Sequence, residues 1–339
     1  MFSRFLILLS ALMFLSCEAQ KAPAVQVQEL SGSIFGSSYS IKYIGDLNPQ
    51  QFKNDLDVFF KNFNSEFSTY QSDSTISSLN QAGEQVRLKV TPRFIAMLKL
   101  AKRLHEQTDG AFDPTLGPII SAWGFGGKGT PKTPEAGVLD EARKHVGIEK
   151  IFWDEAKLEA WKSDALVTLN LNAFAPGWAA DLIGEEFLLK GVTNFMVDIG
   201  GEILVKGKKG DASWLIGIEE PSEAPGQKLH LALKISNLSI ATSGDYRQFF
   251  NEAGTRRSHI IDPRTGQPVT HQISSVTVLA SSAAEADAWG TALMVLGEAG
   301  LPLAEKLGHK IYMLKALGPN KFTSILSSGM QDYLKDHRL

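Results

Sequence analysis

Apolar residues recur along the chain in two patterns, which predict a mixture of helices and strands. After Asn48-Pro49, six apolar residues from Phe52 to Phe67 follow the 3.6-residue period of a helix. Two more helices are expected from Thr91 to about Gln107 and, in an Ala-rich run, over residues 282–296. Further helices are expected at about 135–146, 172–183 and 301–307, and strands at about 25–35, 38–45, 167–171, 194–201, 202–207, 214–218, 229–235, 238–242, 273–280, 311–314 and 322–326.

Helices and strands interleave irregularly, and many strands are close enough in sequence to pair with their neighbours in antiparallel fashion. The sequence contains no internal repeat, low-complexity tract or clear linker. We therefore expect the α+β class: a single large domain over residues 28–339, built from a mainly antiparallel sheet with packed helices.

The N-terminus has the pattern of a secretory signal peptide. Arg4 precedes an apolar run over residues 5–16, which is shorter than the ~20 residues of a membrane span. Leu15-Ser16-Cys17 resembles a bacterial lipobox, so we predict a signal peptide over residues 1–16, lipidation of Cys17 and a tether over residues 17–27. An ordinary signal peptide with an incidental cysteine is the alternative.

Composition limits the remaining possibilities. The 339 residues carry a formal net charge of −3 with no cluster of Lys and Arg, which argues against nucleic acid as a partner. Hydrophobic residues make up 43% and charged residues 21%, as in soluble globular proteins. Cys17 is the only cysteine, which excludes a disulfide framework and any site built from several thiolates.

One helix carries a candidate metal site. Asp287 and Thr291 are four residues apart in the Ala-rich run, so a carboxylate and a hydroxyl project from one helix face. Such oxygen ligands suit Mg²⁺, which keeps several waters and is commonly completed by substrate phosphates. A solvated helix face is the alternative reading of the same pair.

The candidate chemistry is dispersed over the C-terminal two thirds of the chain. A Walker A loop and a GxSxG elbow are absent from the sequence, and the GxGxxG match at 124–129 leads into prolines rather than a helix. A site for a divalent metal and a phosphate-containing ligand would account for most of the polar residues that are candidates for function. A histidine among them could then accept a proton. These candidates are Asp113, Asn170, Asp198, Asp262, Asp287, Thr291 and the histidine His259.

Several short motifs follow one another along the chain. They are residues 33–36 (SIFG), 68–80 (STY…DS…LN), 110–115 (GAFDPT), 170–181, 198–202 (DIGGE), 242–246 (TSGDY), 258–266 (SHIIDPRTG) and 286–291 (ADAWGT). In this order the motifs resemble one family, the ApbE family of FAD:protein FMN transferases, and the similarity covers nearly all of the sequence after the predicted signal peptide.

The resemblance implies an enzyme that transfers the FMN part of FAD to a threonine (or serine) hydroxyl of an acceptor protein. The reaction would depend on Mg²⁺, form a phosphoester and release AMP. The acceptor would be a subunit of a membrane redox complex or a periplasmic reductase, and the enzyme would be lipid-anchored on the periplasmic side of the inner membrane. An FAD pyrophosphatase giving FMN and AMP, and a non-catalytic FAD-binding lipoprotein, are the alternatives.

The resemblance also assigns residues to roles. Asp287, Thr291 and the backbone carbonyl of Ala173 would bind the metal, and His259 and Asp262 would handle the proton of the acceptor hydroxyl. Three positions depart from the family pattern, with Pro176 for lysine, Asn170 for aspartate and Phe35 for methionine. The implied FAD contacts are Phe35, Tyr70, Ala111, Phe112, Asp113, Asn170, Pro176 and Ile261.

Overall fold

The computed structural model describes residues 26–125, 131–135, 137–221, 228–245, 249–252, 255–318 and 320–339. The predicted signal peptide, Cys17 and most of the tether lie outside these residues, as do Tyr246 and most of the glycine-rich stretch at 124–129. None of the helices in the described ranges combines the length and apolar character needed to cross a bilayer.

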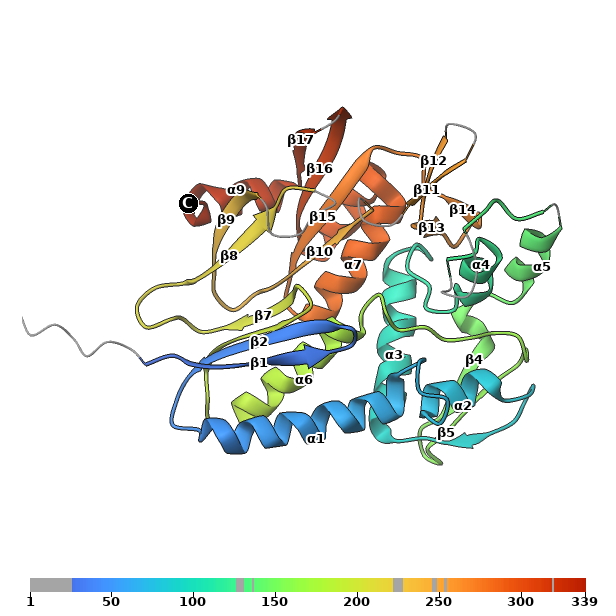
Figure 1. Cartoon of the computed structure of the whole chain (residues 1–339), viewed down its shortest axis with the longest axis horizontal. Coiled ribbons are helices and arrows are strands. Elements are labelled where there is room, and N and C mark those ends of the chain that lie inside the picture. The colour runs from blue at the N-terminus through green and yellow to red at the C-terminus, as the bar shows by residue number, and fades with distance from the viewer. Residues whose placement is uncertain are drawn as a thin grey trace, which may run out of the picture.

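An eight-stranded sheet organises the fold (Figure 1), and every neighbouring pair in it is antiparallel. The strand order is β1-β2-β6-β7-β10-β15-β16-β17. The strands are β1 (Gln28–Ile34), β2 (Ser37–Ile44), β6 (Asn194–Ile199), β7 (Glu202–Lys206), β10 (Ser239–Gly244), β15 (Ile273–Ala280), β16 (Lys310–Gly318) and β17 (Lys321–Leu326). The prediction of one α+β domain with a mainly antiparallel sheet is confirmed.

Three helices, α1 (Pro49–Phe67), α6 (Ala175–Leu189) and α7 (Ala283–Leu296), pack against one face of this sheet, and α3 (Pro92–Gln107) packs against α7. All four contribute to the main hydrophobic core. The side chains of Asn48, Thr91 and Ser282 cap α1, α3 and α7 by accepting a backbone N–H of the first turn. These caps explain why the starts predicted for the three helices are correct.

The opposite face of the sheet is covered by a β-hairpin and the C-terminal helix. Strands β8 (Trp214–Glu219) and β9 (Leu229–Ile235) and helix α9 (Ser328–His337) supply Trp214, Leu233 and Met330 to a second core. The smaller elements are α2 (Thr75–Gln81), α4 (Gly117–Ala122), α5 (Val138–Lys144), α8 (Leu301–Lys306), η1 (Ile148–Lys150), η2 (Gly297–Gly300), β3 (Leu88–Lys89), β4 (Ile151–Asp154), β5 (Glu159–Lys162), β11 (Phe249–Glu252), β12 (Thr255–Ser258), β13 (Ile261–Asp262) and β14 (Gln267–Pro268).

The strand expected at residues 167–171 does not form. The backbone N–H and carbonyl of Leu169 bond instead to the side-chain amide of Asn80, at 2.7 and 2.9 Å. The N–H of Asn170 donates to the carbonyl of Pro114 at 2.7 Å. Val167, Leu169 and Leu171 are buried as they would be in a strand, but side chains and a loop satisfy the backbone groups of this run where a neighbouring strand was expected.

Candidate active site

A tight turn at the edge of the sheet contributes to one side of a pocket. Phe35 and Gly36 connect β1 to β2, with φ of 54° and 76°. Two successive positive φ values are typical of a two-residue hairpin turn, and Phe35 adopts this geometry although it has a side chain. Its ring packs against Phe63 of α1, with the ring centroids 5.3 Å apart, so the turn is fixed on the helix.

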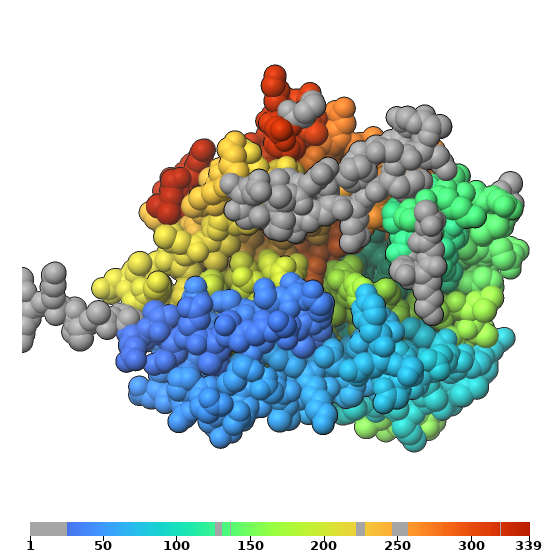
Figure 2. Space-filling view, in the orientation of Figure 1, coloured from blue at the N-terminus to red at the C-terminus, as the bar shows by residue number. Residues whose placement is uncertain are grey.

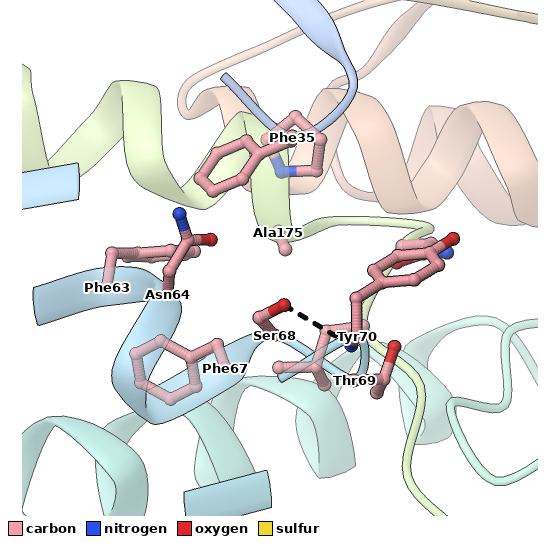
Figure 3. A pocket seen from close by; sticks show the side chains of 11 residues that line it. Phe35, Phe63, Asn64, Phe67, Ser68, Thr69, Tyr70 and Ala175 are labelled. Atoms are coloured by element: carbon pink, nitrogen blue, oxygen red, sulfur yellow. Dashed lines mark hydrogen bonds between the residues drawn. The ribbon is translucent and has the colours of Figure 1, made fainter. Parts of the chain in front are cut away.

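The pocket lies between this turn, the C-terminal end of α1 and the first residues of α6 (Figure 3), and has a volume of ≈ 270 Å³. Phe63 and Phe67 of α1 form one wall, and Ala175 and Pro176 of α6 contribute another. In the space-filling view, yellow-green atoms are set back between the blue N-terminal hairpin and the light-blue segment that follows α1 (Figure 2). Every lining side chain is uncharged, so the pocket suits a planar, largely apolar ring.

Tyr70 stands at the rim of the pocket with 88% of its surface exposed. The loop that carries it is held firmly. Ser68 Oγ accepts the Tyr70 N–H at 3.3 Å, and the Ser68 carbonyl accepts the hydroxyls of Ser74 and Ser77 at 2.7 and 3.3 Å. An exposed aromatic ring on a fixed loop is available to stack on a bound ring.

Asp287 is buried where α7 crosses the beginning of α6, with only 6% of its surface exposed. The two helices can approach closely because Gly177 has no side chain. A Cβ at this position would lie 2.4 Å from the carbonyl oxygen of Ala283. The Gly177 N–H donates to Asp287 Oδ2 at 3.2 Å. Gly177 directly follows the pocket residues Ala175 and Pro176, so the carboxylate and the apolar pocket lie within one turn of α6.

The electrostatics around Asp287 favour a cation. Burial, and then the charge of Glu202, raise the pKa of Asp287 well above its usual value, although the bond from Gly177 opposes this. Burial also raises the pKa of Glu202 and of Asp181 to about 7. A buried carboxylate among other acids is stabilised by a proton or by a metal ion, and its hard oxygen matches Mg²⁺.

The other predicted metal ligands lie near this carboxylate in the fold. Thr291 is one turn further along α7, and Ala173 is two residues before the first residue of α6. Across the described ranges, no group of three or more His, Cys, Asp and Glu side chains converges to hold a metal ion. A site here would therefore use one carboxylate, a hydroxyl, a backbone carbonyl and ligand phosphates, which fits Mg²⁺ but not a metal that needs several imidazoles or thiolates.

Residues 111–113, which are predicted to contact FAD, have side chains that are already buried or hydrogen-bonded within the protein. The side chains of Ala111 and Phe112 are buried in the main core, so only their backbone groups can reach a ligand. Asp113 accepts both the N–H and the hydroxyl of Thr115, at 2.8 and 2.5 Å. Burial raises the pKa of Asp113, and the two bonds from Thr115 offset part of this rise.

Asn170 holds the backbone beside the pocket, whereas the Ile261 side chain lies in a different cluster. The Asn170 side chain accepts the N–H of Asn172, a pocket residue, at 2.9 Å. The side chain of Ile261 packs with Trp123 and Ile119 in a small separate core. A ligand contact from Ile261 would thus come from its backbone.

Asp262 is the last residue of β13, and His259 lies two residues before the first residue of this strand, which packs against α7. Asp262 accepts two hydrogen bonds from the Arg264 guanidinium, at 2.9 and 2.8 Å. Burial alone would raise the pKa of Asp262, but the bonds from Arg264 outweigh it and lower the pKa. The His259 ring lies edge-on to Phe125, with centroids 6.5 Å apart. Of the two, His259 has the chemistry of a proton acceptor near neutral pH.

The structure thus brings Phe35, Tyr70 and Pro176 into one pocket and sets Asp287 beside it. The apolar period predicted only that Phe63 and Phe67 belong to a helix; in the structure both lie in the main core and also line the pocket. Their position in the last turns of a helix that leads into the Tyr70 loop was the available signal.

The fold and the site together define an α+β domain with an uncharged, largely apolar pocket beside a buried carboxylate. The model of the ApbE family matches residues 35–314. FAD:protein FMN transferases of Haemophilus influenzae and Vibrio cholerae are 36% and 38% identical over 314 and 304 residues, covering 90% and 88% of this chain and 90% and 89% of theirs. The apo crystal structure of the flavinyl transferase ApbE of Pseudomonas stutzeri superposes with a TM-score of 0.82 at 30% identity, covering 91% of this chain and 96% of that one. This chain belongs to the ApbE family.

Proposed function

We propose that this protein transfers the FMN part of FAD to a hydroxyl group of an acceptor protein and releases AMP. One observation carries the proposal: Ala175 and Pro176 line the apolar pocket, and the next residue, Gly177, bonds to the buried Asp287. A ring site and a phosphate-directed cation site are therefore one helical turn apart. FAD has this arrangement, because its flavin is joined through a short chain to a diphosphate. The family relationship supports the same activity.

In this proposal the flavin ring occupies the pocket between Phe35 and Tyr70, and Asp287, Thr291 and the Ala173 carbonyl would hold Mg²⁺ when it is bound. The cation, when bound, withdraws charge from the phosphoryl oxygens. Pro176 supplies no positive charge where the family pattern has lysine, so the cation and neutral hydrogen-bond donors must hold the diphosphate.

The reaction itself requires an attacking hydroxyl and a proton acceptor. The acceptor hydroxyl oxygen attacks the phosphorus of the FMN half, and a new O–P bond forms as the bond to the bridging oxygen breaks. The electron pair of the broken bond leaves with AMP, and His259 takes the hydroxyl proton. Asp262, ionised and paired with Arg264, fixes the turn after β13. The acceptor residue is threonine or serine.

We further propose that the enzyme is lipidated at Cys17 and works on the periplasmic side of the inner membrane. This proposal is supported by the signal-like residues 1–16 and the lipobox-like 15–17. Its acceptor is then a flavin-accepting subunit of a membrane redox complex, or a periplasmic reductase.

The proposal is tested by incubating the full-length protein with FAD and following AMP by chromatography, with Mg²⁺ or with EDTA. AMP release that needs both Mg²⁺ and an acceptor protein is the expected result. AMP release at an equal rate without an acceptor would identify an FAD pyrophosphatase instead. FAD that binds but is never cleaved would identify a non-catalytic binding protein.

We predict that Tyr70→Ala weakens FAD binding roughly 5- to 100-fold, because stacking of one aromatic side chain contributes about 1–3 kcal/mol. The melting temperature should not change, since the ring is 88% exposed and supports little of the core. Titration of FAD followed by flavin fluorescence measures the effect. Tyr70→Phe keeps the ring and should bind like wild type, and unchanged affinity in Tyr70→Ala would remove Tyr70 from the site.

A further inference from the structure

We propose that the hydroxyl of Ser243 is a hydrogen-bond donor to the diphosphate of FAD, beside the cation site. The inference rests on the proposed function and adds to it a contact from a different strand. Ser243 lies near the end of β10, next to Gly244.

The position of Ser243 follows from a missing side chain on α7. Gly290 has no Cβ, and one placed there would lie 2.7 Å from Ser243 Oγ and 3.4 Å from Ser243 Cβ. The hydroxyl of the strand residue thus fills the space that a side chain at position 290 would take. A serine or larger residue at 290 could not coexist with Ser243 without a shift of one of them.

Gly290 lies on the same part of α7 as the proposed metal ligands. It is three residues after Asp287 and adjacent to Thr291, and side chains three or four residues apart on a helix have Cβ atoms about 5–6 Å apart. The Ser243 hydroxyl therefore lies on the flank of the carboxylate and threonine pair. It comes from the sheet side, whereas Asp287 contacts α6.

The strand directs Ser243 toward α7 and leaves its hydroxyl available. Side chains alternate along β10, so Thr242 points to the other face, where its Oγ1 is 2.8 Å from Thr277 Oγ1. Ser243 is partly exposed, and its hydroxyl forms no hydrogen bond with the described residues. A free donor beside buried acids has no evident structural task, but it matches a diphosphate held by a cation.

A hydroxyl donor is needed at this position because other groups that could bind the diphosphate are scarce around the pocket. Among the residues that the structure describes, those lining the pocket include no Lys or Arg, and Pro176 lies in the wall at the position where the family pattern has a lysine. The Gly177 N–H, which points out of the first turn of α6, is already used by Asp287. Hydrogen bonds to charged groups are about twice as strong as neutral ones, so one hydroxyl here has a measurable effect.

The test compares FAD with riboflavin, which has no phosphate. In Ser243→Ala we expect the Kd for FAD with Mg²⁺ to rise about tenfold, while riboflavin binding stays unchanged. Ser239→Ala is the matched control: it lies on the same strand, its hydroxyl is buried without a partner, and it should bind both flavins like wild type.

A double variant separates a phosphate contact from a packing effect. Ser243→Ala combined with Gly290→Ser moves the hydroxyl from the strand to the helix and should restore FAD affinity to within about threefold of wild type. Unchanged FAD affinity in Ser243→Ala, or an equal loss for riboflavin, would overturn the inference. If wild type transfers FMN but Ser243→Ala binds FAD normally, only this contact fails; if wild type does not bind FAD, the proposed function fails.

Discussion

Asp287→Asn should lower the rate of FMN transfer by at least about 100-fold, the usual effect of losing a group that stabilises developing phosphoryl or oxyanion charge. The amide keeps a carbonyl oxygen for the Gly177 N–H but loses the charge that holds the cation. Since burial and Glu202 already disfavour the ionised carboxylate, the variant should fold and melt at or above the wild-type temperature. Transfer kinetics and a melting curve on the same sample measure both effects.

Glu285→Gln is the control for Asp287→Asn, because it removes a carboxylate from the first turn of the same helix. Glu285 pairs with Arg103 at 3.3 Å and belongs to neither the pocket nor the cation site. Its activity should stay close to wild type. Full Mg²⁺-dependent transfer by Asp287→Asn would contradict the metal assignment.

Lys162→Met should lower the free energy of unfolding by about 3–5 kcal/mol, without touching the site directly. Lys162 is fully buried, and its Nζ donates to the carbonyls of Asn80, Ala165 and Val167 at 2.6, 2.8 and 2.9 Å. Methionine fills a similar volume but leaves three buried acceptors without a donor. Chemical denaturation followed by tryptophan fluorescence measures the loss.

The matched control is Lys157→Met in the neighbouring turn. The Lys157 side chain is exposed and its ammonium forms a surface ion pair with Asp154, while its backbone hydrogen bonds remain in the variant, so the substitution should cost less than about 0.5 kcal/mol. Equal stability of Lys162→Met and Lys157→Met would show that the buried ammonium does not hold residues 165–169 in place.

The helices could be predicted because their signals are local. Asn48-Pro49 and the apolar period that follows define α1, and Ser282 with the Ala-rich run defines α7. The run at 167–171 misled for an equally physical reason: it is apolar and buried like a strand, but Asn80, 89 residues away from Leu169, takes the place of the neighbouring strand. Sequence spacing carries no information about such a partner.

The site likewise has features that the sequence spacing predicts and contacts that it does not. The i,i+4 spacing of Asp287 and Thr291 indicated a hard-oxygen pair from the sequence alone. That Asp287 meets Gly177, 110 residues earlier in the chain, depends on the close crossing of α6 and α7. The approach of Ser243 to Gly290 depends on the register of β10 beneath α7. Neither contact can be read from spacing, because both arise from packing.

The most direct test of the account is the intact mass of an acceptor protein after incubation with the full-length enzyme and FAD. The proposed acceptor, a flavin-accepting subunit of a membrane redox complex or a periplasmic reductase, is used in wild-type form and with its candidate acceptor threonine replaced by alanine. The account predicts a gain of one FMN by the wild-type acceptor, with AMP released, only when Mg²⁺ is present. AMP release without any gain in mass, or a gain that persists with EDTA, would contradict it.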